Sequence, residues 1–253
     1  MVGGRRVSGS PHQLALEAQA SDFAKDLAHT FSAFLGRDIT FESTTTGSRV
    51  SVAPAEGSDL SVSVGDRKIL SLAVSFRCEF DHRNDYLAIH TSDIKVFAGS
   101  RPNGEPLFRY DYVHSPKDHR PAAHIQVHAH RDQFTQAMTL AAVAGAKHRQ
   151  LGKEDSFEVA RMCTLHFPVG GARFRPCLED VLHMIEIEFG ATTGPEWAAA
   201  RDTGREKFRR QQTGAVVRDC PSEAVRVLKQ LGYKVEEPEN GPTEDRVDRL
   251  RAF

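Results

Sequence analysis

Residues 69–80 read ILSLAVSFRCEF, a long and mostly apolar run that predicts a central β-strand. Just before it, residues 60–64 alternate between apolar residues and serines, and Gly65-Asp66 forms a turn that closes a hairpin onto the run. After it come two strand-like segments, residues 87–90 and 94–97, which we interpret as one bent strand. This part of the chain therefore predicts an antiparallel sheet in which consecutive strands pair.

The two-residue period continues on both sides of this central part. Short strands are expected on the N-terminal side, at residues 39–41 and 50–52. On the C-terminal side, residues 107–112 and 124–130 again alternate along the chain. Residues 37–130 are therefore expected to form an antiparallel meander of about six to eight strands.

A helix is expected before the sheet. Ser10 suits the N-cap, Pro11 the first turn and Gln13 the capping-box position, while Gly36 supplies the stop. Between them runs an apolar stripe at helical spacing, formed by Leu16, Ala20, Phe23, Leu27, Phe31 and Phe34. The pattern predicts that this helix buries one face against the sheet.

Helical periodicity dominates after residue 130. Helices are expected over residues 134–146 and from Pro176, Pro195 and Pro221 onward, with one further strand at 159–167. Three residues of the last helix are expected to face inward, namely Val225, Leu228 and Leu231. The predicted fold class is α+β: an antiparallel β-sheet packed against an N-terminal helix, with a mainly helical C-terminal third. We expect a disordered N-terminus (1–9), an α+β sheet domain (10–150), a helical region packed on it (151–235) and a flexible tail (236–253).

Composition argues against several classes of protein. The 253 residues are 40% hydrophobic with a net charge of −1, so bulk electrostatics does not favour polyanion binding. The cysteines at 78, 163, 177 and 220 lack CxxC spacing and are typical of reduced cytosolic thiols. The N-terminus does not resemble a signal peptide, and no segment approaches the roughly 20 apolar residues of a membrane span. We expect a cytoplasmic protein without a membrane partner; the sequence does not predict its oligomeric state.

Candidate chemistry concentrates in residues 107–131, LFRYDYVHSPKDHRPAAHIQVHAHR, which hold histidines 114, 119, 124, 128 and 130. Alternation places Arg109 and Asp111 on one side of the first strand and Tyr110 on the other. In the second strand, His124, Gln126, His128 and His130 share a face. If the two strands pair, Arg109 and Asp111 are expected beside His124 and His128.

Three interpretations of this histidine face stay open. As a metal-independent ribonuclease site, His124 and His128 would be the acid–base pair, Arg109 and Arg131 the phosphate clamp, and Tyr110 and His130 supporting groups. As a metal site, His128 and His130 would bind zinc, iron or manganese with a third ligand such as Asp111, His114 or His166, although no metal motif is complete. The third interpretation is a solvated polar face without chemistry.

Two groups of arginines are further candidates. Arg173 and Arg175 precede an expected helix N-terminus, which favours anions, although they have acidic neighbours in the next turn. Arg201, Arg205 and Arg209 form a four-residue stripe on the next helix, which suits either a nucleic-acid backbone or an ordinary solvated face. The segment His90-Thr91-Ser92 matches half of the paired H-x-[ST] motif of two-histidine phosphoesterases, but no second copy exists.

Residues 86–111, ending in Phe108-Arg109-Tyr110-Asp111, together with His114, His124, His128 and His130, resemble the TumE-type toxin component of bacterial toxin–antitoxin modules. Residues 178–182, LEDVL, look like the last helix of that family. The likeness covers a minor part of the chain. Residues 112–116, YVHSP, depart from the family's tighter Pro/His segment, and the additional helices and strands exceed its compact fold.

The resemblance implies a toxin-like action on RNA and a cognate antitoxin partner. The leading hypothesis is therefore a cytosolic, bacterial, RNA-acting enzyme that needs no cofactor. The alternatives are a non-catalytic binding or regulatory protein using the basic C-terminal helix, and a metal-dependent hydrolase.

Overall fold

The computed structural model describes residues 11–80, 86–114, 122–127, 131–143 and 175–250. Helix α1 (Pro11–Leu35) precedes seven strands and is followed, after them, by five more helices in the described part of the chain. The strands are β1 (Phe41–Thr46), β2 (Arg49–Pro54), β3 (Ser61–Val64), β4 (Arg67–Phe80), β5 (Leu87–Ala98), β6 (Phe108–Val113) and β7 (Ala123–Val127). The later helices are α2 (Arg131–Val143), α3 (Leu178–Phe189), α4 (Trp197–Asp219), α5 (Pro221–Gln230) and α6 (Val247–Leu250).

All seven strands belong to one antiparallel sheet with the order β1-β2-β4-β5-β6-β7, and β3 pairs with part of β4. The predicted central run is β4, which is the longest strand of the sheet and pairs with β2, β3 and β5. The two segments expected to form one bent strand are continuous in β5, whose register to β4 shifts between Arg77 and Cys78. The predicted α+β fold class is confirmed.

Helix α1 packs its predicted apolar stripe on this sheet. Phe31 and Phe34 are fully buried, and the ring of Phe31 stacks on that of Phe41 at the start of β1, with centroids 5.2 Å apart. Phe23 meets Phe76 of β4 edge to face, also at 5.2 Å. The helix ends at Leu35, where Gly36 adopts a positive φ of 63°, as the stop signal predicted.

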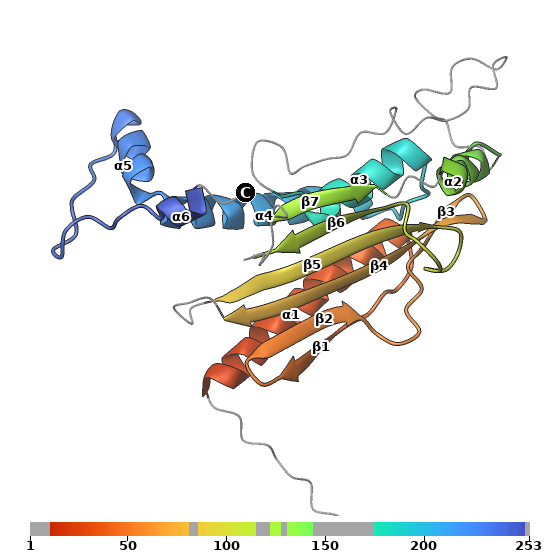
Figure 1. The fold of residues 1–253 in the computed structure, drawn as a ribbon, viewed down its shortest axis with the longest axis horizontal. Coiled ribbons are helices and arrows are strands. Elements are labelled where there is room, and N and C mark those ends of the chain that lie inside the picture. Colours follow the sequence, from red (N-terminus) through yellow and green to blue (C-terminus); the bar gives the residue numbers. More distant parts are fainter. Residues whose placement is uncertain (1–10, 81–85, 115–121, 128–130, 144–174, 251–253) are drawn as a thin grey trace, which may run out of the picture.

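Helix α3 and the first part of α4 share the side of the sheet on which α1 lies (Figure 1). Helix α3 buries its predicted face, formed by Leu178, Val181, Leu182, Ile185 and Phe189, and ends at Gly190 in the left-handed conformation. Trp197, the first residue of α4, is 2% exposed and meets Phe34 of α1 edge to face at 4.9 Å. The same core therefore joins the sheet, α1 and the C-terminal helices.

The prediction that Val225, Leu228 and Leu231 of the last long helix, α5, face inward is wrong. No residue of α5 is buried, and Leu228 and Leu231 are 39% and 68% exposed. The helix has the expected amphipathic pattern, but α4 extends beyond the sheet and carries α5 away from the core (Figure 1). Sequence periodicity identified an apolar face without indicating whether another element would cover it.

The remaining predictions concern the N-terminus, the strand expected at residues 159–167 and the tail from residue 236. Residues 1–9 and the expected strand at 159–167 lie outside the described residues. Within the region expected to be a flexible tail, residues 236–250 are described and include α6. Arg246 links this region to the end of α4 through an ion pair with Asp219, in which Nη1 lies 3.2 Å from Oδ1.

Replacing Gly194 by alanine is expected to lower the free energy of unfolding by about 1–3 kcal/mol, because the close approach of α1 to the loop before α4 leaves no space for a methyl group. A Cβ atom at this position would lie 2.5 Å from the carbonyl oxygen of Ala33 and 2.9 Å from Cα of Gly36, and both are backbone atoms. The matched control is Gly214→Ala on α4, where the nearest atom is a flexible arginine tip at 3.5 Å. That variant should be as stable as the wild type or more so. Urea unfolding that ranks the two variants in the opposite order would contradict this packing.

Candidate functional site

Two rows of polar side chains cross β5, β6 and β7 on the face of the sheet opposite the core. The register pairs Asp111 of β6 with His124 of β7, and Arg109 with Gln126. Strand β5 extends both rows. The rows are Asp93, Asp111 and His124, and Lys95, Arg109 and Gln126. The strands that hold the predicted site are thus neighbours, and they bring Arg109 and Asp111 beside His124.

The side chains in these rows already bind one another. Nε of Arg109 donates to Oε1 of Gln126 at 2.5 Å and lies 3.0 Å from Oδ2 of Asp111. Nε2 of His124 lies 3.5 Å from the same carboxylate oxygen, and the side chains of His124 and Asp111 are only 12% and 9% exposed. Burial raises the pKa of Asp111, while the charge of Arg109 acts in the opposite direction. Arg109 would have to leave both partners to clamp a phosphate.

The other residues of the predicted histidine site are not all on this face. Tyr110 is 4% exposed and lies on the core side of the sheet, where burial and the charge of Asp180 on α3 raise its pKa. It therefore does not face the same space as Arg109 and His124. Arg131 is the first residue of α2, and its side chain lies outside the described part of the structure. His128, His130 and Arg173 lie outside the described residues.

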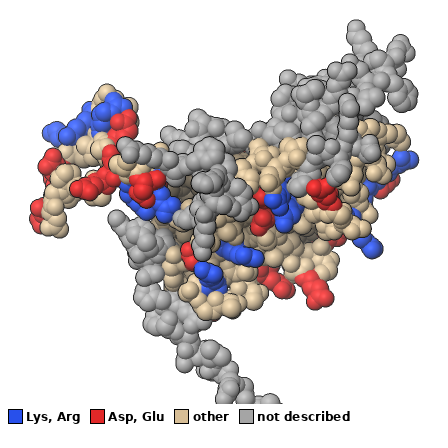
Figure 2. All heavy atoms as spheres, in the orientation of Figure 1, with Lys and Arg blue, Asp and Glu red and all other residues tan. Residues whose placement is uncertain are grey.

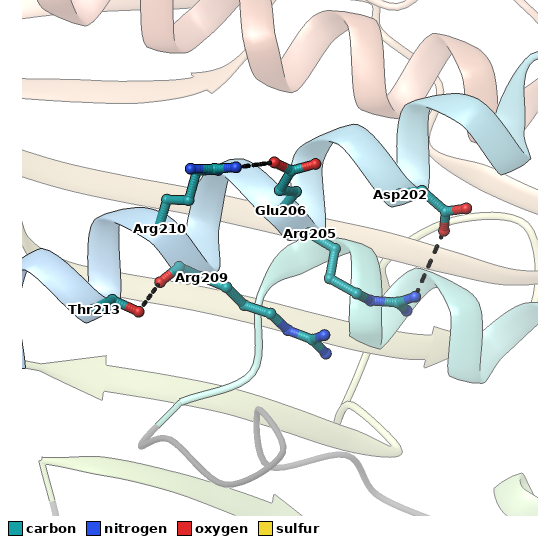
Figure 3. A pocket seen from close by; sticks show the side chains of 6 residues that line it. All are labelled: Asp202, Arg205, Glu206, Arg209, Arg210 and Thr213. Atoms are coloured by element: carbon teal, nitrogen blue, oxygen red, sulfur yellow. Dashed lines mark hydrogen bonds and ion pairs between the residues drawn. The ribbon is translucent and has the colours of Figure 1, made fainter. Parts of the chain in front are cut away.

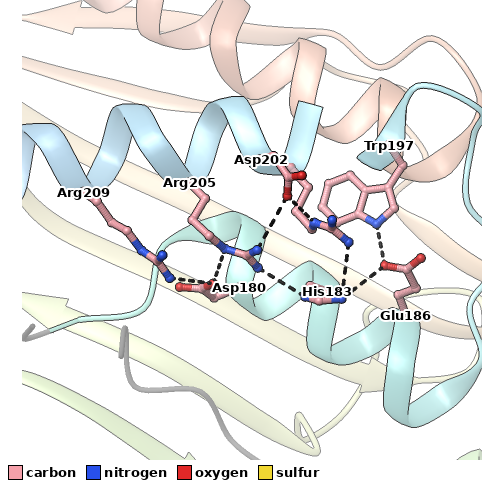
Figure 4. Close-up of polar contacts among 8 residues, drawn as sticks. Asp180, His183, Glu186, Trp197, Asp202, Arg205 and Arg209 are labelled. Atoms are coloured by element: carbon pink, nitrogen blue, oxygen red, sulfur yellow. Dashed lines mark hydrogen bonds and ion pairs between the residues drawn. The ribbon is translucent and has the colours of Figure 1, made fainter. Parts of the chain in front are cut away.

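The predicted arginine stripe on α4 is directed at α3 (Figure 4). Nε of Arg205 donates to Oδ1 of Asp180 at 2.8 Å, and Nη2 of Arg209 lies 4.0 Å from the same oxygen. Arg201 donates to its neighbour Asp202 at 2.9 Å. In this network the three arginines face three carboxylates, those of Asp180, Glu186 and Asp202.

His183 of α3 lies in the middle of this network. Its Nδ1 is 3.2 Å from Nη2 of Arg205, and its Nε2 is 3.4 Å from Nη1 of Arg201. Burial, followed by the charge of Arg201, lowers its pKa. A guanidinium only donates and a neutral imidazole has a single acceptor nitrogen, so His183 can accept a hydrogen bond from only one of Arg205 and Arg201; its Nε2 also lies 4.0 Å from Glu186. These contacts fasten α4 to α3 and leave little free positive charge.

A shallow hollow of about 640 Å³ lies along α4 (Figure 3). It is lined by Asp202, Arg205, Glu206, Arg209, Arg210 and Thr213. Arg210 is paired with Glu206 at 2.7 Å, so this wall is also close to neutral. Figure 2 shows acidic and basic side chains interspersed over the described part of the visible face. The charge pattern does not favour a site for a nucleic-acid backbone on α4.

Arg175 lies between the sheet and α4 rather than at an open helix terminus. Its guanidinium carbon is 4.2 Å from the ring centre of Tyr112 on β6 and 5.4 Å from that of Phe208 on α4. Burial lowers its pKa, and its Nη1 has no hydrogen-bond partner among the described residues. The acidic neighbours in the next turn do not pair with it; Asp180 pairs with Arg205. The two aromatic rings therefore hold this buried cation.

A second group of histidines occupies the corner of the sheet where β4 ends, β5 begins and β6 ends. His90 lies in β5 between Ile89 and Thr91, which pair with consecutive residues of β4, so it is the extra residue of a β-bulge. The bulge directs His90 toward Glu79, with Nδ1 2.9 Å from Oε1, although the N–H is not aligned with the oxygen. His114 follows β6, and its backbone N–H donates to the carbonyl of His90 at 2.8 Å. The two imidazole centroids are 6.3 Å apart.

The tautomer of His114 follows from its neighbours. Nη2 of Arg249, in α6, lies 2.8 Å from Nε2 of His114 and must be the donor. The hydrogen of the neutral ring is then on Nδ1, which lies 3.2 Å from the hydroxyl oxygen of Tyr112 and donates to it. Burial, followed by the charge of Arg249, lowers the pKa of His114. His114 is thus a neutral imidazole with its lone pair on Nε2 at neutral pH.

We define this group, Glu79, His90, Tyr112, His114 and Arg249, as the corner site. From the sequence, His90 is half of a phosphoesterase motif, and His114 is a candidate third metal ligand and one of the residues of the TumE-type resemblance. No local pattern could place them together with Arg249, which is 135 residues from His114 in the chain. The usable signals were the half motif at His90 and the resemblance that includes His114.

Comparison with protein-family models, with curated proteins and with solved structures finds no significant match for this chain. The likeness to TumE-type toxins stays a prediction from sequence. Among the residues that the structure describes, no group of three or more His, Cys, Asp or Glu side chains is arranged to hold a metal ion. None of the helices in the described ranges combines the length and hydrophobicity needed to cross a membrane.

The corner site has the groups that acid–base chemistry at neutral pH requires. One histidine is neutral with a defined lone pair, and the other lies against a carboxylate that would pair with its protonated form. The side chains of His90 and Glu79 are 35% and 34% exposed, so water and a ligand can approach them. The Arg109–Asp111–His124 group is more deeply buried, and its charged groups are already paired.

Proposed function

We propose that this protein is a metal-independent enzyme that cleaves RNA at the corner site. His114 acts as the general base, His90 as the general acid, and Glu79 orients His90. The observation that carries the proposal is the pair of imidazoles 6.3 Å apart, one beside the carboxylate of Glu79 on β4 and the other in contact with the hydroxyl of Tyr112 on β6. The sequence-level likeness to RNA-directed toxins supports the same substrate class.

RNA suits two histidines because it contains its own nucleophile. Nε2 of His114 takes the proton of the 2′-hydroxyl, and that oxygen attacks the adjacent phosphorus. The bond from phosphorus to the 5′-oxygen breaks, and this oxygen takes the proton from Nε2 of His90. The products are a 2′,3′-cyclic phosphate and a free 5′-hydroxyl, so that atoms and charges balance without a metal ion.

The purified full-length protein is expected to cleave end-labelled single-stranded RNA in the presence of EDTA. Mass spectrometry should find 2′,3′-cyclic phosphate ends, and RNA with 2′-O-methyl groups should stay intact because its nucleophile is blocked. Equal cleavage of the methylated RNA, or a requirement for divalent metal, would contradict the mechanism. So would the absence of cleavage both by the wild type and by a variant without the Arg249 side chain that contacts His114.

The other functions expected from the sequence are less well supported by the geometry. Binding through the basic helix α4 would rely on Arg201, Arg205 and Arg209, whose charges are opposed by neighbouring carboxylates. A metal-dependent hydrolase would rely on His128 and His130, which lie outside the described residues. Both stay predictions, as does the antitoxin partner.

A further inference from the structure

Residues 245–250, which include α6 and are called the C-terminal segment below, place Arg249 in contact with the proposed base, His114. Nη2 of Arg249 donates to Nε2 of His114 at 2.8 Å, and Nη1 donates to the backbone carbonyl of the same residue at 3.3 Å. One guanidinium thus forms two hydrogen bonds to His114, one to the imidazole and one to the backbone carbonyl. The nitrogen it occupies is the atom that would take a proton from the substrate.

We propose that α6 is an autoinhibitory cap, in which Arg249 occupies the lone pair of His114 and lowers the rate of cleavage, because only molecules from which the segment has moved away are active. This inference rests on the proposed function, because it assigns a regulation to the same site. An imidazole nitrogen offers a single lone pair, so it cannot accept from Arg249 and from a substrate hydroxyl at the same time. Catalysis and the observed contact exclude each other.

The attachment of α6 to the rest of the protein is suited to reversible release. The helix has four residues and none is buried; Val247 and Leu250 are 46% and 53% exposed. Outside the corner site, the segment is held by polar contacts, from Arg246 to Asp219 and from Asp245 to Ser222. The first contact is partly buried and the second exposed, and polar contacts of this kind stabilise weakly compared with a buried apolar face. The segment can therefore detach without disturbing the core.

The charged groups around His114 come from several elements. Arg249 and Arg246 come from the C-terminal segment, Glu79 from β4 and His90 from β5, and the hydroxyl of Tyr112 from β6. Both arginines and His90 lower the pKa of His114, whereas Glu79 raises it. Removing Arg249 deletes the strongest of these charge effects and opens the ring to solvent. Both changes move the pKa of His114 up toward the usual value of about 6.5.

The cap is tested by replacing Arg249 with alanine in the full-length chain. The matched control is Arg226→Ala, which removes an arginine of α5 that pairs only with Glu223 among the described residues. Diethyl pyrocarbonate, which modifies an imidazole at its lone-pair nitrogen, gives a readout that does not depend on RNA. Modification of His114, followed by peptide mass spectrometry, should be faster by about threefold or more in R249A and unchanged in R226A. NMR titration should show a higher pKa of His114 in R249A only.

RNA cleavage completes the test. A faster rate in R249A, together with faster modification, supports the cap. Unchanged modification and an unchanged pKa of His114 would overturn it. Faster modification with slower cleavage would also overturn it, because Arg249 would then serve the substrate rather than block the base. Faster modification, with no cleavage by R249A or by the wild type, would show a covered His114 while rejecting the proposed function.

Discussion

Replacing His114 by alanine is expected to slow RNA cleavage by about 100- to 10,000-fold, which is the usual contribution of a positioned general base. Replacing His90 should have an effect of similar size, because the leaving oxygen would depart without a proton. Steady-state cleavage of a short labelled RNA measures both. The double variant should be little slower than either single variant, since the two groups act in the same step.

The matched control is His124→Ala, which removes a histidine that lies outside the corner site, on β7. Its side chain is 12% exposed and lies beside Asp111, so the variant tests the histidine face predicted from the sequence. We expect cleavage close to that of the wild type. Loss of activity in H124A with full activity in H114A would move the catalytic centre back to the Arg109–Asp111–His124 group and reject the corner site.

The dependence of the cleavage rate on pH tests whether His114 is the general base. A general base must be neutral, so activity should fall as the pH drops through the pKa of His114. Because burial and Arg249 lower that pKa, this acid limb should lie below the usual histidine value of about 6.5. In R249A the limb should move to higher pH, in the same direction as the NMR titration.

The elements with strong periodicity could be predicted from the sequence because their partners are close in the chain. The stripe of α1 indicates which face of the helix is buried, the apolar run of β4 predicts a central strand, and the structure confirms both. Helix α5 has an equally clear pattern, but burial of Leu228 depended on whether another element lies opposite it. Whether such an element lies there depends on the path of the chain, and the hydrophobic periodicity of α5 contains no information about that path.

The candidate site, like the fold, could be predicted from the sequence only in part. Alternation correctly placed Arg109 and Asp111 on one side, and adjacency of the two strands brought His124 beside them. The corner site depends on a one-residue bulge that redirects His90, and on a contact between residues far apart in the chain. A period of two assumes an unbroken register, so it could not place a side chain at a bulge.

Replacing Trp197 by alanine is expected to lower the free energy of unfolding by about 3–5 kcal/mol, the usual range for deletion of a buried large aromatic side chain. The indole is 2% exposed and packs against Phe34 of α1. Its Nε1 also donates to Oε2 of Glu186 at 2.6 Å, which joins the start of α4 to the last turn of α3 in a single contact. The variant therefore removes an aromatic contact, leaves a cavity and leaves a carboxylate without its donor. Urea unfolding followed by circular dichroism measures the loss.

Trp197→Phe separates the two contributions, because it keeps an aromatic ring against Phe34 and removes only the N–H and part of the ring volume. Its cost should be smaller, about 1–3 kcal/mol, and Glu186→Gln should cost less again because an amide oxygen still accepts from the indole. Since Phe34 belongs to the helix that packs on the sheet, W197A should lower the unfolding midpoint of strands and helices together. If W197A melted the C-terminal helices in a separate transition and left the sheet unchanged, the shared core of α1, α3 and α4 would not be one cooperative unit.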